Sequence, residues 1–83
     1  MDHFGPSYTR AQGLYLPDLA GAYALAGDVH TAVSIGHQAI DVVTTLSSPR
    51  AHTGLRTLHT VLEPLHTSPG VADLRARLAN TAA

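Results

Sequence analysis

The sequence predicts an all-α fold made of antiparallel helical hairpins, with about four helices. Apolar residues recur every three or four positions along the chain, and no segment alternates between apolar and polar residues as a half-buried strand would. A glycine break at 27 and serine–proline breaks at 48–49 and 68–69 divide the chain into four such segments. The connections between the segments are about 2–6 residues long, as antiparallel neighbours require.

The length of the chain limits it to a single helical domain over residues 1–83. A chain of 83 residues buries only a thin core, so its margin of stability is small. Hydrophobic residues make up 45% of the chain, which is ordinary for a folded globular segment and argues against disorder throughout.

The first helix is expected to run from about Arg10 to Ala26 with a bend. Ser7 is a candidate cap for a start near Tyr8. Pro17 allows two interpretations, because an interior proline removes a hydrogen bond and clashes with the preceding turn. Either a long helix kinks at Pro17, which we favour, or a shorter helix begins with Pro17 in its first turn. One helix face carries the apolar residues spaced i, i+3, i+4 and i+7, which are Leu16, Leu19, Ala20 and Tyr23.

A glycine turn should separate the first helix from the second. Gly27 fits the position just after a helix, where a positive φ costs glycine little. Asp28 can then cap the second helix by accepting hydrogen bonds from its first backbone N–H groups. The residues of this segment that keep a helical period are Ala32, Ile35 or Gly36, Ala39, Val43 and Leu46.

A serine–proline pair marks the start of the third helix. Ser48 is the expected cap, and Pro49 suits the first helical position. Pro64 should bend or end the helix near Leu62 or Glu63. The inward stripe is leucine alone, at Leu55, Leu58, Leu62 and Leu65.

The fourth helix is short and should begin with the same kind of pair, Ser68 and Pro69. It is expected to run to about Ala79. Its inward residues should be Val71, Leu74 and Leu78, and its outward residues Asp73, Arg75 and Arg77.

Composition excludes several classes of function. The six acidic residues nearly balance five arginines, so the chain has no basic footprint for nucleic acid and no polybasic membrane patch. No apolar run approaches the ~20 residues that span a bilayer, and the first residues lack the regions of a secretory signal. We therefore expect no direct nucleic-acid contact, no membrane association and a cytoplasmic location. The lack of lysine suggests the coding bias of a GC-rich genome.

No pattern of residues points to catalysis, so we expect no catalytic residues and no enzyme. The chain has no cysteine, which excludes disulfides and thiolate chemistry. No nucleophile elbow, phosphate loop or Ser/His/Asp order is present. The spacing of the acidic residues does not indicate a pair of carboxylates that could act together in acid–base catalysis.

The six histidines are the remaining candidates for chemistry, and their spacing argues against a metal site. Two sets repeat every seven residues, which places neighbours ~10.5 Å apart on a helix, whereas ligands to one zinc ion need spacings of three or four. We therefore predict no metal and no cofactor, and expect the histidines at the margin between core and water. A metal- or pH-sensitive contact between chains is the alternative. The two sets are His52, His59 and His66, and His30 and His37.

The first hairpin resembles a tetratricopeptide repeat, whose 34-residue unit places small and large residues at fixed sites on two helices. Gly36 and Thr44 depart from the pattern, where a large apolar residue and a proline are common. The resemblance implies a tetratricopeptide-like hairpin over 7–46. It also implies a degenerate second hairpin or cap over 48–80, where Thr53, Gly54 and Thr57 stand at the key sites. The matching residues are Leu16, Leu19, Ala20, Tyr23, Gly27, Ala32 and Ala39.

A second resemblance covers more of the chain. The runs Tyr15–Gly27 and Leu74–Leu78 look like the C-terminal end of actinobacterial transcriptional regulators. Those proteins carry an N-terminal helix-turn-helix and a C-terminal tetratricopeptide-like region. This sequence has no helix-turn-helix, so DNA binding is not carried over. The resemblance implies an oligomerising or effector-binding end, either cut from a longer protein or standing alone.

The tetratricopeptide resemblance also implies a binding face on the first helix. By that mapping Leu14, Pro17, Gly21 and Ala24 would face a ligand, and they include none of the charged residues that hold peptide carboxylates. Such a small, apolar face suits the close approach of another helix. The alternative is that Gly21 and Ala24 pack on the third or fourth helix of the same chain.

We therefore expect a module for protein–protein interaction or oligomerisation, with a protein or peptide partner. A homodimer or a longer parent protein would supply the repeats that two hairpins lack, since about three or more are needed for stability. One alternative is a ligand- or peptide-sensing domain of a regulator, with a pocket lined by Tyr15, Leu19 and Tyr23. Another is a small stand-alone scaffold protein.

Overall fold

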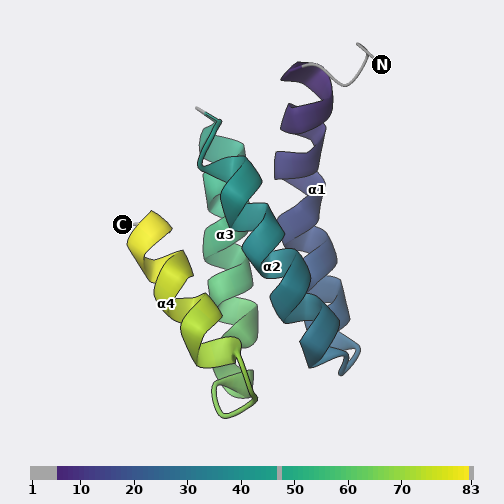
Figure 1. Cartoon of the computed structure of the whole chain (residues 1–83), viewed down its shortest axis with the longest axis vertical. Helices are drawn as coiled ribbons and strands as arrows, with labels where there is room; N and C mark the ends of the chain where they lie inside the picture. Colours follow the sequence, from purple (N-terminus) through teal and green to yellow (C-terminus); the bar gives the residue numbers. More distant parts are fainter. Residues whose placement is uncertain (1–5, 47, 83) are drawn as a thin grey trace.

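The long helix α1 opens the part of the chain that the computed structural model describes, which comprises residues 6–46 and 48–82. These residues form an all-helical structure without strands, so the predicted fold class is confirmed (Figure 1). The elements in order are α1 (Pro6–Leu25), α2 (Val29–Val43), α3 (Pro49–Leu62), the short 3-10 helix η1 (Glu63–Leu65) and α4 (Val71–Ala82).

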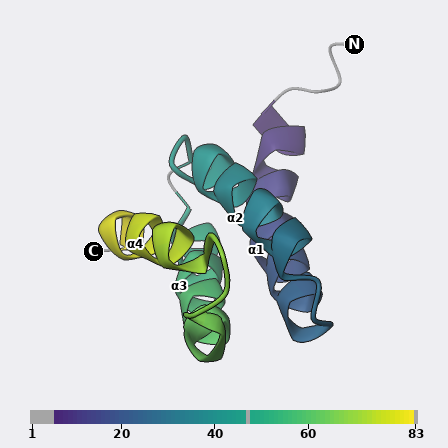
Figure 2. The same ribbon diagram turned by 60° about the horizontal axis from the view of Figure 1, so that its bottom comes forward.

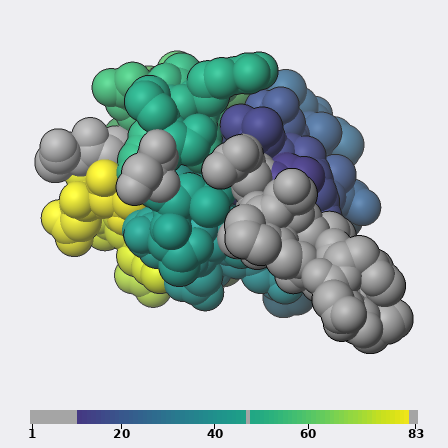
Figure 3. All heavy atoms as spheres, turned by 90° about the horizontal axis from the view of Figure 1, so that it is seen from above, coloured from purple at the N-terminus to yellow at the C-terminus, as the bar shows by residue number. Residues whose placement is uncertain are grey.

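The helices form two hairpins that lie side by side. α1 pairs with α2 and α3 pairs with α4, while α1 also packs on α3 and α2 on α4. Figures 1 and 2 show α2 and α4 lying over α1 and α3, so the array has two layers. Figure 3 looks along the long axis and shows α1 and α4 on opposite sides of the molecule. Each hairpin therefore has one side packed on the other hairpin and one side at an edge of the array.

The turn between α1 and α2 has the predicted geometry. Gly27 has a φ of +90°. Its N–H donates to the carbonyl of Ala24, and the N–H of Asp28 donates to the carbonyl of Tyr23, which together define a Schellman motif. The Asp28 side chain accepts from the N–H of Thr31 at 3.3 Å, so the predicted cap is confirmed. Two adjacent residues thus end one helix and begin the next.

α1 begins earlier than predicted, at Pro6, and continues through Pro17 to Leu25. The expectation that Ser7 caps the helix is wrong, because Ser7 lies inside it. A proline is well suited to the first position of a helix, where its missing N–H would have no partner in any case. Of the two interpretations of Pro17, the structure has the long helix that continues past it.

The start and end of α3 match the prediction. The Ser48 hydroxyl accepts from the N–H of Ala51 at 3.3 Å, and Pro49 occupies the first helical position. The helix ends at Leu62, and Pro64 lies in η1. Ser47, which directly precedes this serine–proline pair, lies outside the described residues.

The start of α4 differs from the prediction, since Ser68 and Pro69 belong to a turn. Gly70 has a φ of +82°, and the N–H of Val71 donates to the carbonyl of Ser68. Proline followed by a glycine with positive φ is the signature of a type II turn. The glycine therefore delays the helix to Val71.

The far end and the outer face of α4 also differ from the prediction. The helix continues to Ala82 instead of ending near Ala79. Asp73 and Arg77 are exposed as expected, whereas Arg75 is half-buried. A residue expected to point outward therefore lies partly against its neighbours.

Most of the core is built from residues that the helical periods indicated, but Leu19 and Tyr23, expected on the apolar face of the first helix with Leu16 and Ala20, are exposed. α2 ends at Val43, earlier than the apolar pattern suggested, but Leu46 still packs against the core. The buried hydrophobic residues among those described are Leu16, Ala20, Ala24, Ala32, Ala39, Ile40, Val43, Ala51, Leu55, Leu58, Leu62, Val71, Leu74 and Leu78.

The two positions that depart from the repeat pattern have a structural explanation. A Cβ at Gly36 would lie 2.6 Å from Cδ2 of Leu74, so the Leu74 side chain fills the space that a large residue would otherwise take. Thr44 caps the end of α2, where its N–H donates to the carbonyl of Ile40 at 3.0 Å. A proline at 44 would lose that hydrogen bond.

We predict that Gly36→Ala lowers the free energy of unfolding. The new methyl group would also lie 3.1 Å from Cδ1 of Leu74, which is itself fully buried, so the whole leucine must shift. Overpacking costs about 1–3 kcal/mol and outweighs the roughly 1 kcal/mol that alanine gains over glycine in a helix. Urea unfolding followed by circular dichroism measures the difference.

The matched control is Gly21→Ala, also in mid-helix. No atom lies within 4 Å of a Cβ built there, so this variant should be stabilised by about 0.5–1 kcal/mol. Equal stabilisation of both variants would show that Leu74 moves aside without cost.

A candidate docking groove between α1 and α3

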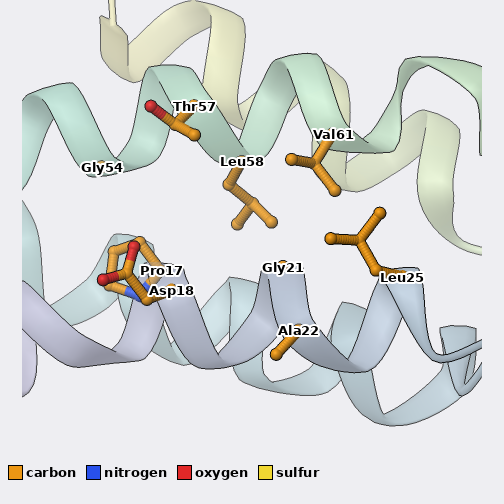
Figure 4. A pocket seen from close by; sticks show the side chains of 9 residues that line it. All are labelled: Pro17, Asp18, Gly21, Ala22, Leu25, Gly54, Thr57, Leu58 and Val61. Carbon is orange, nitrogen blue, oxygen red and sulfur yellow. The ribbon is translucent and has the colours of Figure 1, made fainter.

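An apolar groove lies between α1 and α3 (Figure 4). Its volume is about 280 Å³, and it is open to solvent along one side. Figure 4 shows the side chains of Leu58, Val61 and Leu25 projecting into the space between the two helices. The lining residues are Pro17, Asp18, Gly21, Ala22 and Leu25 of α1, and Gly54, Thr57, Leu58 and Val61 of α3. We call this feature the docking groove.

Two glycines determine the shape of the docking groove. A Cβ at Gly54 would lie 3.2 Å from Cβ of Pro17, so the proline ring packs directly against the backbone of α3. One turn further along α1, Gly21 has open space where its side chain would be. The helices are therefore in close contact at Pro17, and the groove opens beside Gly21.

The structure brings together two of the four predicted binding residues. Pro17 and Gly21 line the docking groove, whereas Leu14 lines an adjoining hollow. Ala24 is buried in the core with 4% of its surface exposed, so the prediction that it faces a ligand is wrong. It lies on the side of α1 that packs into the core.

The side of the groove formed by α3 was missed by the sequence analysis. Gly54, Thr57, Leu58 and Val61 supply it. In the sequence, Gly54 and Thr57 stand out only as key sites of the second hairpin, and Leu58 only as part of its inward stripe. A glycine inside a helical segment costs about 1 kcal/mol relative to alanine, so it often has a packing reason. Such a glycine does not indicate which helix packs against it.

A second, more polar hollow continues the docking groove towards the start of α3. It shares Asp18, Gly54 and Thr57 with the groove, and it adds Arg50. The remaining lining residues are Leu14, Tyr15 and Thr53. The combined surface is therefore apolar at one end and bears one acid and one base at the other.

The residues expected to line a ligand pocket enclose neither the docking groove nor either of two further hollows. Tyr15 lines two open hollows, one beside α3 and one beside α2. Leu19 and Tyr23 line neither of these two hollows nor the docking groove. All three side chains are exposed, at 45%, 38% and 36%.

Among the described histidines, His37, His52 and His59 lie at the margin of the core as predicted, whereas His30 and His66 are exposed. Arg77 donates from Nη1 to Nδ1 of His37 at 2.9 Å and from Nη2 to Asp41 at 2.8 Å, which joins α4 to α2. His52 and His59 are half-buried, and His66 is exposed. Within residues 6–46 and 48–82, no group of three or more His, Asp or Glu side chains could hold a metal ion.

Comparisons with protein-family models, with curated proteins and with solved structures each gave no match to this chain. Among the described helices, none is both long and apolar enough to cross a membrane. Any function therefore has to be inferred from the docking groove and the surfaces beside it.

We predict that the contact between Arg77 and Asp41 contributes little to stability. The two side chains are 44% and 68% exposed, and exposed pairs are typically worth less than about 1 kcal/mol. A double-mutant cycle with Arg77→Met and Asp41→Asn, measured by urea unfolding, should give a coupling energy in that range. A coupling above about 2 kcal/mol would contradict this view and indicate that His37 strengthens the pair.

Proposed function

We propose that this chain is a tetratricopeptide-like interaction module that takes an apolar segment of a partner protein in the docking groove. The observation that carries the proposal is the open space beside Gly21, which has apolar walls on both helices. A side chain from another polypeptide can enter that space without displacing any residue of this chain.

The size and chemistry of the groove favour a polypeptide over a small molecule. Its volume of about 280 Å³ lies at the lower limit of small-molecule sites, which are usually about 300–1,000 Å³ and bury most of their ligand. An amphipathic helix laid along a groove buries only the side chains of one face. Leu25 and Val61 offer such a face an accessible apolar surface, and Asp18 and Arg50 can orient it.

We further propose that the module belongs to the regulatory end of a helix-turn-helix transcription factor. The support is the likeness of Tyr15–Gly27 and Leu74–Leu78 to the C-terminal region of actinobacterial regulators. In such a protein the docking groove would receive a segment that controls the DNA-binding part, and this chain itself would make no contact with nucleic acid.

Peptide selection tests the proposed groove. Peptides selected on this protein from a random phage-displayed library should bind with a Kd that rises about 10-fold or more in Gly21→Phe. The added ring fills the space that one apolar side chain would occupy, and burial of such a side chain is worth about 1.5–3 kcal/mol. Isothermal titration calorimetry measures the Kd, and amide chemical shifts should change at Gly21, Gly54 and Val61.

The matched control is Ser34→Phe, which adds the same ring at an exposed position of α2 that lines neither the docking groove nor the two hollows. This variant should bind the selected peptides as tightly as the wild type. Selected peptides that bind Gly21→Phe and the wild type equally well, or a selection that enriches no peptide, would contradict the proposal.

A further inference from the structure

The side of α1 that faces away from α3 carries an exposed apolar stripe. Tyr15, Leu19 and Tyr23 recur every four residues along it. Each lies two residues from Pro17 or Gly21, which is roughly half a turn round the helix from the side that meets α3. The stripe is thus at the edge of the array and outside the docking groove.

α2 extends this edge with two more apolar residues. Ile35 and Val42 are half-buried, and Val42 shares a hollow with Tyr15. They lie two and five residues from His37, which meets α4, so they face the side of α2 away from the second hairpin. We define the open edge as Tyr15, Leu19, Tyr23, Ile35 and Val42.

The opposite edge of the array is polar. On α3 it carries His52, Arg56 and His59, which lie two or five residues from Gly54 and so face away from α1. Arg75 of α4 is half-buried and lies two residues from Arg77, which meets α2, so it faces the side of α4 away from α2. The Nδ1 atom of His52 and the Nε atom of Arg75 are buried without a hydrogen-bond partner among the described residues.

Helical arrays need a polar outer surface at each end and an apolar surface wherever two hairpins stack. The second hairpin has the polar outer surface that the end of an array needs. The first hairpin lacks one, because its open edge is an apolar surface of the kind on which another hairpin stacks. The array is therefore complete on one side and incomplete on the other.

We propose that the open edge docks on the open edge of a second copy of this chain, related by a two-fold axis. The product is a stack of four hairpins in which both outer ends are polar edges. A two-fold contact closes on itself, whereas a head-to-tail contact continues to grow. Head-to-tail stacking would also cover the arginines and histidines of the polar edge with apolar groups, which removes charge from water.

The size and charge of the open edge fit this partner. α1 and α2 are 20 and 15 residues long, so at about 1.5 Å per residue they span roughly 30 and 22 Å. With axes ~8–10 Å apart and helices ~10 Å in diameter, they present an edge about 19 Å wide, on the order of 500 Å² per copy. Two such edges bury about 1,000 Å², which is the lower limit for a specific interface. The five residues carry no charge. The hollow that Tyr15 and Val42 share is also lined by Gln12, Gln38 and Asp41, and the Asp41 carboxylate is paired with Arg77 of the same chain.

Sedimentation equilibrium of the whole chain over a wide range of concentration tests the pairing. The expected mass rises from one chain of 8.7 kDa to two chains and stops there. In Leu19→Lys the dissociation constant should rise about 30-fold or more, because the two-fold axis places two lysines in one apolar interface. Tyr15→Lys, at a more exposed position, should act in the same way and serves if Leu19→Lys fails to fold.

The matched control is Leu25→Lys, on the same helix but lining the docking groove. At 79% exposure it should fold normally and dimerise like the wild type. A chain that remains monomeric, a mass that continues beyond two chains, or an equal effect of Leu25→Lys would overturn the pairing. These results are independent of peptide binding in the docking groove. Leu25→Lys should weaken that binding, and Leu19→Lys should leave it unchanged.

Discussion

The packing of Leu74 over Gly36 is the contact on which the arrangement of the two hairpins depends. A Cβ at Gly36 would meet three carbon atoms of the leucine within 3.4 Å, so only glycine lets α4 approach α2 this closely. Leu74 is fully buried there, and its burial joins the second hairpin to the first. On the other layer, Pro17 packs against Gly54. Each layer thus joins the two hairpins through a glycine on one helix and a larger side chain on the other.

The docking groove follows from this pairing of hairpins. α1 and α3 are held together at Pro17 and Gly54, but Gly21 has no opposing side chain within 4 Å. The resulting space is open because the contacts elsewhere already fix the distance between the helices. A binding surface can therefore occupy that space without weakening the core, which lies on other faces of the same helices.

Local sequence signals predicted most of the fold correctly. The positive φ at Gly27, the caps at Asp28 and Ser48 and the end of α3 at Leu62 each depend on interactions within a few residues. The start of α4 was misjudged although its signal was also local, because the Pro69–Gly70 pair specifies a turn more strongly than Ser68 specifies a cap. Such errors come from competing local signals.

The candidate site was harder to predict because it depends on distant parts of the chain. The groove forms where Gly21 and residues more than thirty positions later lie on opposite sides of an open space, and no periodicity within α1 shows which of its faces meets α3. Ala24 was misplaced for that reason. Likewise, the sequence alone does not indicate which edge is neutral and apolar and which is charged, because this depends on how both hairpins pack.

The inequality of the two edges has a consequence for protein engineering. A further helical hairpin grafted before α1 would meet Tyr15, Leu19 and Tyr23 and would lengthen the array without covering a charged residue of that surface. The same hairpin grafted after α4 would have to cover Arg75 and the histidines of α3. This small scaffold can therefore be extended by design in one direction only.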